Sequence, residues 1–260
     1  MTGMLELENV VPSGGQFPVS LGVRGGLVYV LNSGGAGSVS GFLLGPDGLT
    51  PIPGSGRSLG LANATPPNFL TSPGQVGFTP DGKQLLVTTK ASTSSIDVFR
   101  VAKDGLLSAT PVVNPSATPV PFAFTFAGNL LVSGEAGASS VTTYRVSGAG
   151  SLNGALSASD GQGALCWIER VGNVFFVSNT ATNNLSSFGL GPNGQPILLS
   201  AVAATTNPGP IDLAGSGRFL YAETGINGTV DEFRIGPNGT LTPIGSVDDL
   251  RPGIEGIAAT

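Results

Sequence analysis

A pattern that recurs about every 45 residues constrains the fold of this chain more than any other feature. Each copy begins with a short apolar run, and the residue at its centre is called here the anchor. The anchors are Val30, Val87, Val132, Val177 and Ala222. The first interval between anchors is 57 residues and the other three are 45. The shared period shows that one structural unit is repeated five times.

Two further positions keep the same register in every copy. An aromatic residue follows each anchor by eleven or twelve residues: Phe42, Phe99, Tyr144, Phe188 and Phe233. A glycine follows each aromatic by six: Gly48, Gly105, Gly150, Gly194 and Gly239. Each repeat holds four short apolar segments separated by Gly, Pro, Asn and Ser, which is typical of four antiparallel strands joined by tight turns.

Four strands in about 45 residues form the unit of a β-propeller, whose blades bury both faces against their neighbours. The sequence therefore predicts an all-β propeller in a single domain, residues 1–260. Its five complete blades are expected at about 17–57, 74–114, 119–159, 163–203 and 208–248.

Both ends of the chain carry a segment that resembles a single strand. Met4 to Val11, with Gly3 in the place of a turn glycine, resembles a fourth strand, and Pro252 to Ala258 resembles a first strand. We expect these orphan strands either to close a reduced ring or to mark a chain shortened relative to a longer propeller, and the second interpretation is favoured.

The composition narrows the class of function. Only 10% of the residues are charged, the net charge is −5, and no Lys/Arg cluster occurs, which argues against a nucleic-acid partner. No apolar run is long enough to span a membrane, and no signal peptide is apparent, so a cytoplasmic location is expected. Cys166 lies in an apolar run, which predicts a buried thiol. No Cys/His cluster suggests a metal site.

Twelve extra residues separate the first two anchors, within Ser55 to Ser72. This insertion joins an outer strand to the next inner strand, over the face where propellers usually bind ligands. It is expected to be either a lid or a tolerated surface loop.

Several segments resemble the lactonase-type seven-bladed propellers, the group of 6-phosphogluconolactonase-like and carboxymuconate-cyclase-like proteins. They are TPDGKQLLVTT, GRFLYAET, CWIERVGNVFFVSN and the turns followed by LTPI. The resemblance covers about residues 17–260. It implies seven blades, with the shortfall before Met1, and a carbohydrate-lactone activity at the channel mouth. The chain has no histidine, whereas the family's chemistry is attributed to His, Glu and Arg.

Three acids interrupt the repeat at similar places: Glu169, Asp212 and Glu255, at intervals of 43 residues. Because inner strands line the axis, the acids are expected at one level of the channel. There they would raise one another's pKa, as general acid/base work requires, or hold a divalent cation. The alternative is a set of solvated acids or acids paired with arginine.

Lys90 and Glu135 each follow an anchor by three residues. Neighbouring blades are expected to place them together on one rim, where the lysine would polarise a carbonyl and the glutamate orient a water. A structural salt bridge is the alternative. Arg24, Arg170 and Glu223 are further candidates for substrate binding.

These features favour a lactonase-like hydrolase that acts on a small sugar or carboxylate lactone, with no required cofactor. One of Glu135, Glu169, Asp212 and Glu255 would be the base. The rival interpretation is a non-catalytic binding or scaffold propeller, favoured by the absence of histidine. The expected partner is a small molecule, and self-association through open blade edges is also expected.

Overall fold

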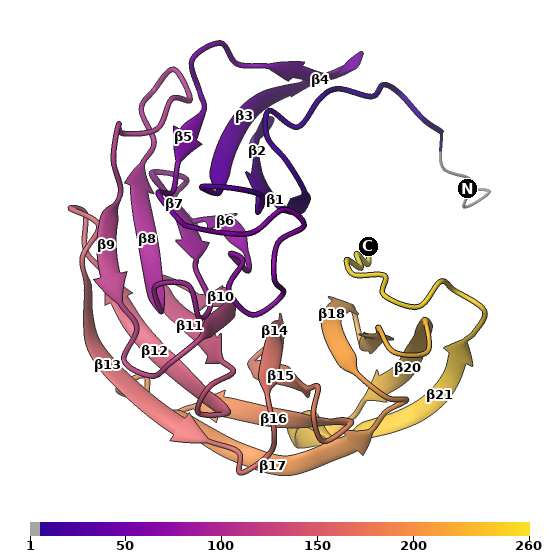
Figure 1. Ribbon diagram of the computed structural model, residues 1–260. Coiled ribbons are helices and arrows are strands. Elements are labelled where there is room, and N and C mark those ends of the chain that lie inside the picture. Colours follow the sequence, from indigo (N-terminus) through magenta and orange to yellow (C-terminus); the bar gives the residue numbers. More distant parts are fainter. Residues whose placement is uncertain (1–5) are drawn as a thin grey trace.

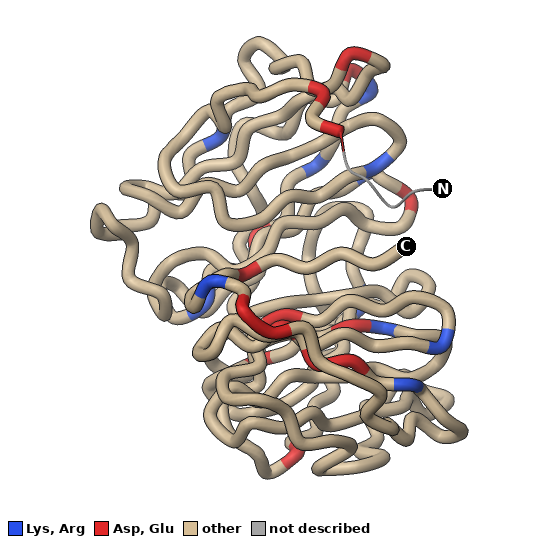
Figure 2. The backbone as a smooth tube through the Cα atoms, turned by 90° about the vertical axis from the view of Figure 1, so that its right-hand side faces the viewer, with Lys and Arg blue, Asp and Glu red and all other residues tan. Residues whose placement is uncertain are grey.

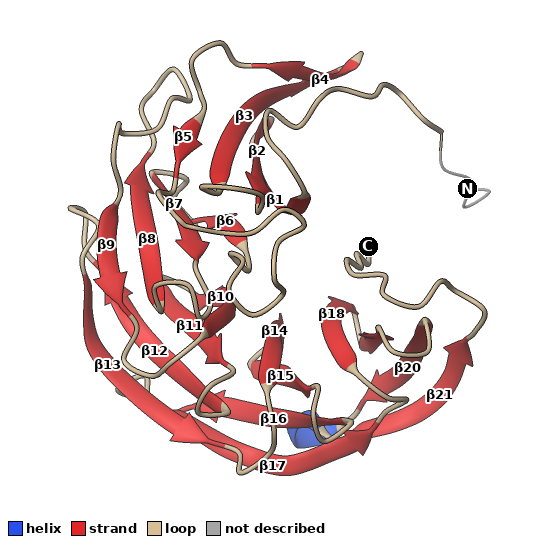
Figure 3. Ribbon diagram, viewed as in Figure 1, coloured by secondary structure: helices blue, strands red, loops and turns tan. Residues whose placement is uncertain are grey.

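The computed structural model describes residues 6–260, and almost all of its regular structure is β-strand (Figure 3). Five antiparallel sheets lie around a central axis (Figure 1). The strands of the five sheets, in chain order, are β1 (Pro18–Arg24), β2 (Leu27–Asn32), β3 (Ser38–Gly45), β4 (Gly48–Pro51) and β5 (Arg57–Ser58); β6 (Val76–Phe78), β7 (Gln84–Thr88), β8 (Ser95–Arg100) and β9 (Val112–Pro115); β10 (Pro121–Ala127), β11 (Leu130–Glu135), β12 (Ser140–Val146) and β13 (Leu152–Ser159); β14 (Leu165–Val171), β15 (Val174–Asn179), β16 (Asn184–Leu190) and β17 (Pro196–Thr205); and β18 (Pro210–Ser216), β19 (Phe219–Thr224), β20 (Thr229–Ile235) and β21 (Leu241–Val247). A short 3-10 turn, η1 (Pro237–Gly239), precedes β21.

Each sheet is one propeller blade, and this confirms the predicted fold. The four strands of a blade follow one another in space in the order of the chain, with the first innermost (Figure 1). The five sheets span residues 18–58, 76–115, 121–159, 165–205 and 210–247. In the first blade, the two-residue strand β5 adds a further pairing beside β3. In the described part of the chain, no helix is long and apolar enough to cross a membrane.

The repeated residues explain why the blades form. All five repeat aromatics are at most 3% exposed, and four of them, Phe99, Tyr144, Phe188 and Phe233, belong to hydrophobic clusters of the core. Full burial of such a side chain contributes about 1.5–3 kcal/mol. All five turn glycines have a positive φ, between 76° and 95°. Only glycine adopts that conformation freely, so its place in the repeat is fixed by the turn.

Neither terminal segment forms the strand that the sequence predicts. Residues 6–13 and 252–258 have no strand assignment, while Gly3, Met4 and Leu5 lie outside the described residues. The amino-terminal segment is held by a side chain: Asn9 donates to the Leu49 carbonyl (2.9 Å) and accepts from its N–H (3.0 Å). A strand needs backbone hydrogen bonds to a neighbouring strand along its length. Each terminal segment makes only single hydrogen bonds to separate groups.

The ring is open on the side where the chain ends lie (Figure 1). Its amino-terminal blade therefore exposes an apolar face. Leu21 on β1 pairs with the anchor Val30 and is 64% exposed. Three of its four counterparts beside the other anchors, Val76, Ile168 and Leu213, are at most 2% exposed, and the fourth, Thr125, is half-buried. The expectation that open edges drive self-association follows from this surface and stays a prediction.

Candidate functional site

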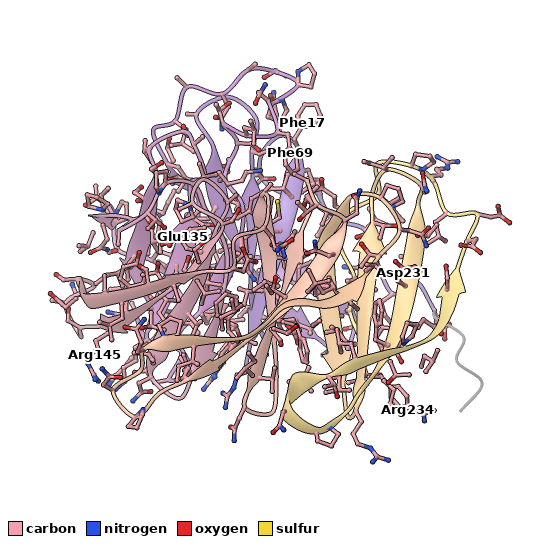
Figure 4. All side chains as sticks on the ribbon, turned by 90° about the horizontal axis from the view of Figure 1, so that it is seen from below. Phe17, Phe69, Glu135, Arg145, Asp231 and Arg234 are labelled. Carbon is pink, nitrogen blue, oxygen red and sulfur yellow. The ribbon has the colours of Figure 1, made fainter. Side chains whose placement is uncertain are left out.

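A cavity of about 170 Å³ lies at one end of the channel, where inner strands begin. Its charged lining residues are Lys90, Asp212 and Glu255, and Trp167 and Phe122 add aromatic surface. Pro67, Phe69 and Ser72 of the insertion also line it, so the insertion covers this mouth as a lid would. In Figure 4, Phe69 lies towards the opposite face of the ring from Arg145 and Arg234.

Lys90 is held under the insertion by its backbone and by two aromatic rings. Its φ of 47° is a left-handed conformation, and its N–H donates to the Pro121 carbonyl (3.2 Å). The side chain is only 3% exposed. Its Nζ lies 4.1 Å from the ring centre of Phe69 and 4.7 Å from that of Phe122, a cation–π arrangement.

The lysine has no carboxylate partner within 4.0 Å among residues 6–260. Burial lowers the pKa of Lys90 from its ordinary 10.5 to about 8, and the charge of Glu255 offsets part of this effect. An ammonium group with a pKa near 8 is still mostly protonated at neutral pH, and it remains available to a negative oxygen.

Asp212 lines the same cavity as the lysine. It is 6% exposed on β18, where one carboxylate oxygen accepts the N–H of Leu213 (2.7 Å) and the other that of Ile257 (3.3 Å). Burial raises the pKa of Asp212 to about 7, and the charges of Glu223 and Glu169 add to the effect. Its carboxylate is therefore poised to exchange a proton near neutrality.

Glu223 pairs with Asp212 across β18 and β19 and lies behind the cavity. It is 2% exposed, and neither carboxylate oxygen has a partner with hydrogen-bond geometry. Burial raises the pKa of Glu223 to about 7; the nearby Gly256 N–H lowers it, and the charge of Glu255 raises it. The charge of Glu223 in turn holds Asp212 towards its protonated form.

Glu255 reaches the cavity from the carboxy-terminal segment. Its residue is exposed to solvent, and Gly253 in the same segment is anchored by an N–H to the Gly225 carbonyl (2.7 Å). The surrounding protein raises the pKa of Glu255, while the positive charge of Lys90 lowers it. Two of the three predicted channel acids, Asp212 and Glu255, thus meet here.

The prediction that Glu169 shares their level is wrong. Asp212 precedes Leu213, the partner of an anchor, whereas Glu169 follows Ile168, the equivalent partner in its own blade. An interval of 43 in a repeat of 45 displaces the acid by two residues, roughly 6–7 Å along a strand. Trp167 occupies the level of Asp212 instead. Burial raises the pKa of Glu169 to about 7, but it lines no part of this cavity.

Lys90 and Glu135 do not meet on a rim either. Glu135 is completely buried and accepts hydrogen bonds from five hydroxyl groups within its own part of the ring: Ser116 (2.7 Å), Tyr144 (2.7 Å), Ser140 (3.2 Å), Thr118 and Thr142. The salt bridge considered as the alternative does not form among the described residues, because hydroxyls surround the Glu135 carboxylate and Lys90 lies against two aromatic rings.

Arg24 and Arg170 lie near the other ends of their inner strands, beside the turns that lead to the second strands. Arg170 donates from Nε to the Gly172 carbonyl (2.8 Å) and from a terminal nitrogen to that of Phe126 (2.9 Å). Arg24 is exposed and packs near Gly82. Neither lines the mouth cavity, so the binding role expected of both has no support in this geometry.

Sequence reasoning missed the aromatic lining. Phe69 lies in the insertion, which departs from the repeat, and Trp167 is the only tryptophan of the chain. Both features were visible as departures from the pattern, but their meeting at one cavity depends on the fold. Cys166 agrees with expectation: it is buried, and burial raises the pKa of its thiol to about 11, so it is not a reactive thiolate.

Two other observations delimit the site. A larger cavity, about 370 Å³, lies between the second and third blades; Asp81 and Lys83 in its lining form a surface salt bridge (3.7 Å). Its remaining charged lining residue is Arg100, so this cavity has no acid outside an ion pair, unlike the mouth cavity. Among residues 6–260, no three His, Cys, Asp or Glu side chains are arranged to hold a metal ion, so a cation site at the channel acids has no support.

Comparison with known proteins gives the fold. No family model matches the chain, and no curated protein does. Solved structures match over most of its length. A "putative 6-phosphogluconolactonase" from Bacteroides uniformis shares 21% identity over 97% of this chain and 77% of its own (TM-score 0.74). One from Bacteroides fragilis shares 21% over 91% and 73% (TM-score 0.70). The periplasmic gluconolactonase of Pseudomonas aeruginosa shares 17% over 91% and 87% (TM-score 0.56).

Proposed function

We propose that the chain is a lactonase-like hydrolase that opens a small lactone in the mouth cavity. One observation carries the proposal: an amine and a carboxylate of opposite charge line one small cavity without pairing with each other. Groups that are held apart in this way leave room for a substrate between them. Three of the structural neighbours have names that refer to lactonases, which supports the same class of reaction.

The roles follow from the chemistry of each group. Asp212, as the carboxylate, would take a proton from water while the water oxygen attacks the lactone carbonyl carbon. The Lys90 ammonium would stabilise the negative oxygen of the tetrahedral intermediate. When the ring C–O bond breaks, the proton held by Asp212 passes to the leaving alkoxide. The product is a hydroxy acid, and the carboxylate is regenerated.

Glu223 would act as a positioning residue behind the base. Its proximity contributes to the raised pKa of Asp212, about 7, which brings the carboxylate close to the pH at which general bases are most effective. Activity requires Asp212 ionised and Lys90 protonated. Turnover should therefore rise as pH passes about 7, fall beyond about 8, and have its maximum between these values.

The test is a screen of small lactones, measured above the spontaneous rate, with Asp212→Asn and Lys90→Met. Each substitution should lower kcat by roughly 100-fold or more, as removal of a general base or an oxyanion donor does. Asp97→Asn is the matched control for a buried acid, and Lys103→Met for a lysine; neither residue lines the cavity. Hydrolysis that survives both cavity substitutions would refute the assignment.

A binding propeller without turnover is the second candidate. The contact of Lys90 with two aromatic rings favours it, because the same contact stabilises a lysine that has no chemical task. Trp167 lines the cavity and is the only tryptophan, so its fluorescence reports ligand binding at this site alone. A fluorescence response to a lactone that is never hydrolysed would select this candidate.

A further inference from the structure

The charges of the mouth cavity select against an anionic ligand. Two carboxylates, Asp212 and Glu255, face a single amine, Lys90, and a third acid, Glu223, lies buried behind them. The amine is in addition covered by the rings of Phe69 and Phe122. A phosphate monoester carries a charge of about −1.5 to −2 at neutral pH. A bound phosphate monoester would place this negative charge beside the carboxylates. Lys90, which the two rings partly cover, would be the one cation in the lining to offset it.

The hydrogen-bonding groups point to the same conclusion. Ionised carboxylates only accept hydrogen bonds, and the hydroxyls of Ser33 and Ser72 already donate to the carbonyls of Phe17 and Phe69 (both 3.1 Å). Apart from the Lys90 ammonium and the Trp167 indole N–H, the polar side chains of the cavity therefore offer acceptors. A ligand rich in hydroxyl donors satisfies them, whereas a phosphate or carboxylate group brings acceptors of its own.

The size and the aromatic surface fit a sugar-like ring. Trp167, Phe69 and Phe122 give the cavity flat apolar surfaces, against which the C–H face of a sugar ring packs. A volume of about 170 Å³ is below the roughly 300–1,000 Å³ of pockets that hold drug-sized ligands. A single ring suits this space better than two linked rings.

We infer that the ligand of the mouth cavity is an uncharged, hydroxyl-bearing lactone of one ring, and that phosphorylated and carboxylated lactones are disfavoured. This inference rests on the proposed lactonase function and decides between the sugar and carboxylate substrates that the sequence left open. In this scheme Glu255 determines specificity, because its exposed negative charge repels anionic ligands from the cavity.

The experiment compares three probes: glucono-1,5-lactone, its 6-phosphate and a carboxylated γ-lactone. Hydrolysis and Trp167 fluorescence are measured in parallel at low and high salt. We expect the neutral lactone to have a kcat/KM at least roughly tenfold above either anion. Glu255→Gln should narrow that ratio by roughly threefold or more, and high salt should narrow it in the wild type. Asp47→Asn, which removes an exposed acid outside the cavity, should leave the ratio unchanged.

The outcomes separate this inference from the function on which it rests. Hydrolysis with the 6-phosphate or the carboxylated lactone preferred would overturn the inference and leave the lactonase function standing. Absence of hydrolysis, with fluorescence changes only for the neutral lactone, would overturn the function while supporting the selectivity. Equal responses to all three probes, or a ratio unmoved by Glu255→Gln, would overturn the charge argument.

Discussion

Replacing Lys90 by methionine should make the protein more stable at neutral pH. The wild-type side chain is buried as an ammonium group with no carboxylate within 4.0 Å among residues 6–260. Methionine keeps the length and apolar character of the side chain and removes the charge. The folded state then no longer bears the cost of desolvating that charge.

The size of the effect follows from the lowered pKa of Lys90. A change from 10.5 unfolded to about 8 folded means that protonation disfavours the folded state by about 3 kcal/mol at pH 7. The variant also loses the cation–π contacts with Phe69 and Phe122, and this loss destabilises it by about 1–2 kcal/mol. We therefore expect Lys90→Met to raise the free energy of unfolding by about 1–2 kcal/mol at pH 7.

The pH dependence distinguishes this cause from simple repacking. Because the folded pKa is lower than the unfolded one, the penalty in the wild type is complete below about pH 8 and disappears as pH rises towards 10.5. Urea unfolding of wild type and Lys90→Met at pH 7 and pH 10 measures the difference, with the exposed Lys103→Met as control. A variant less stable at pH 7, or a gain of equal size at both pH values, would show that the charge is not the cause.

Three further results are expected. The pKa values of Asp212 and Glu223 are both raised to about 7, so the folded state binds more protons than the unfolded state between pH 4 and 7. The free energy of unfolding should therefore fall by several kcal/mol over this range, and the fall should be smaller in Asp212→Asn. Urea titrations at a series of pH values would measure both. Glu135→Ala should lower the unfolding free energy by about 3–5 kcal/mol, because five hydroxyls lose their acceptor; a change below about 1 kcal/mol in the same assay would contradict this. Sedimentation velocity should find self-association that Leu21→Lys abolishes, and a wild-type monomer at all concentrations would rule it out.

The fold could be predicted because its determinants are local in the chain. A turn glycine such as Gly194 fixes a positive φ within its own hairpin, and an aromatic such as Phe188 needs only a neighbouring blade to be buried. Both requirements recur in each copy. The terminal segments failed for the opposite reason: a strand there depends on partners that the pattern around Asn9 or Gly253 does not specify.

The site was predicted only in part, because it depends on register and on departures from the repeat. Counting residues placed Glu169 with Asp212, yet a displacement of two residues puts them on different levels, with β-bulges in both inner strands. Glu135 was chosen by the same rule as Lys90. Its surroundings are hydroxyls from two segments of the chain, the connection before β10 and strand β12, and no spacing rule brings these together in advance.

The mouth cavity differs from the rest of the protein in the burial of its charged groups. Charged residues make up 10% of the chain, and Figure 2 shows them spread over much of the tube, with several acidic stretches close together in its lower half. At the mouth, however, Lys90, Asp212 and Glu223 are all at most 6% exposed and lack ion pairs among the described residues. Each of these groups destabilises the folded state in its charged form. Glu135 is also a buried acid, but five hydroxyls donate hydrogen bonds to it, whereas among the described residues neither carboxylate oxygen of Glu223 has a hydrogen-bond partner and Lys90 has no carboxylate within 4.0 Å. If Lys90→Met and Asp212→Asn raise stability and also abolish turnover, the cost is explained by function. If they raise stability and leave every activity and binding response unchanged, the cavity is not the working site, and the open face beside Leu21 becomes the surface to test.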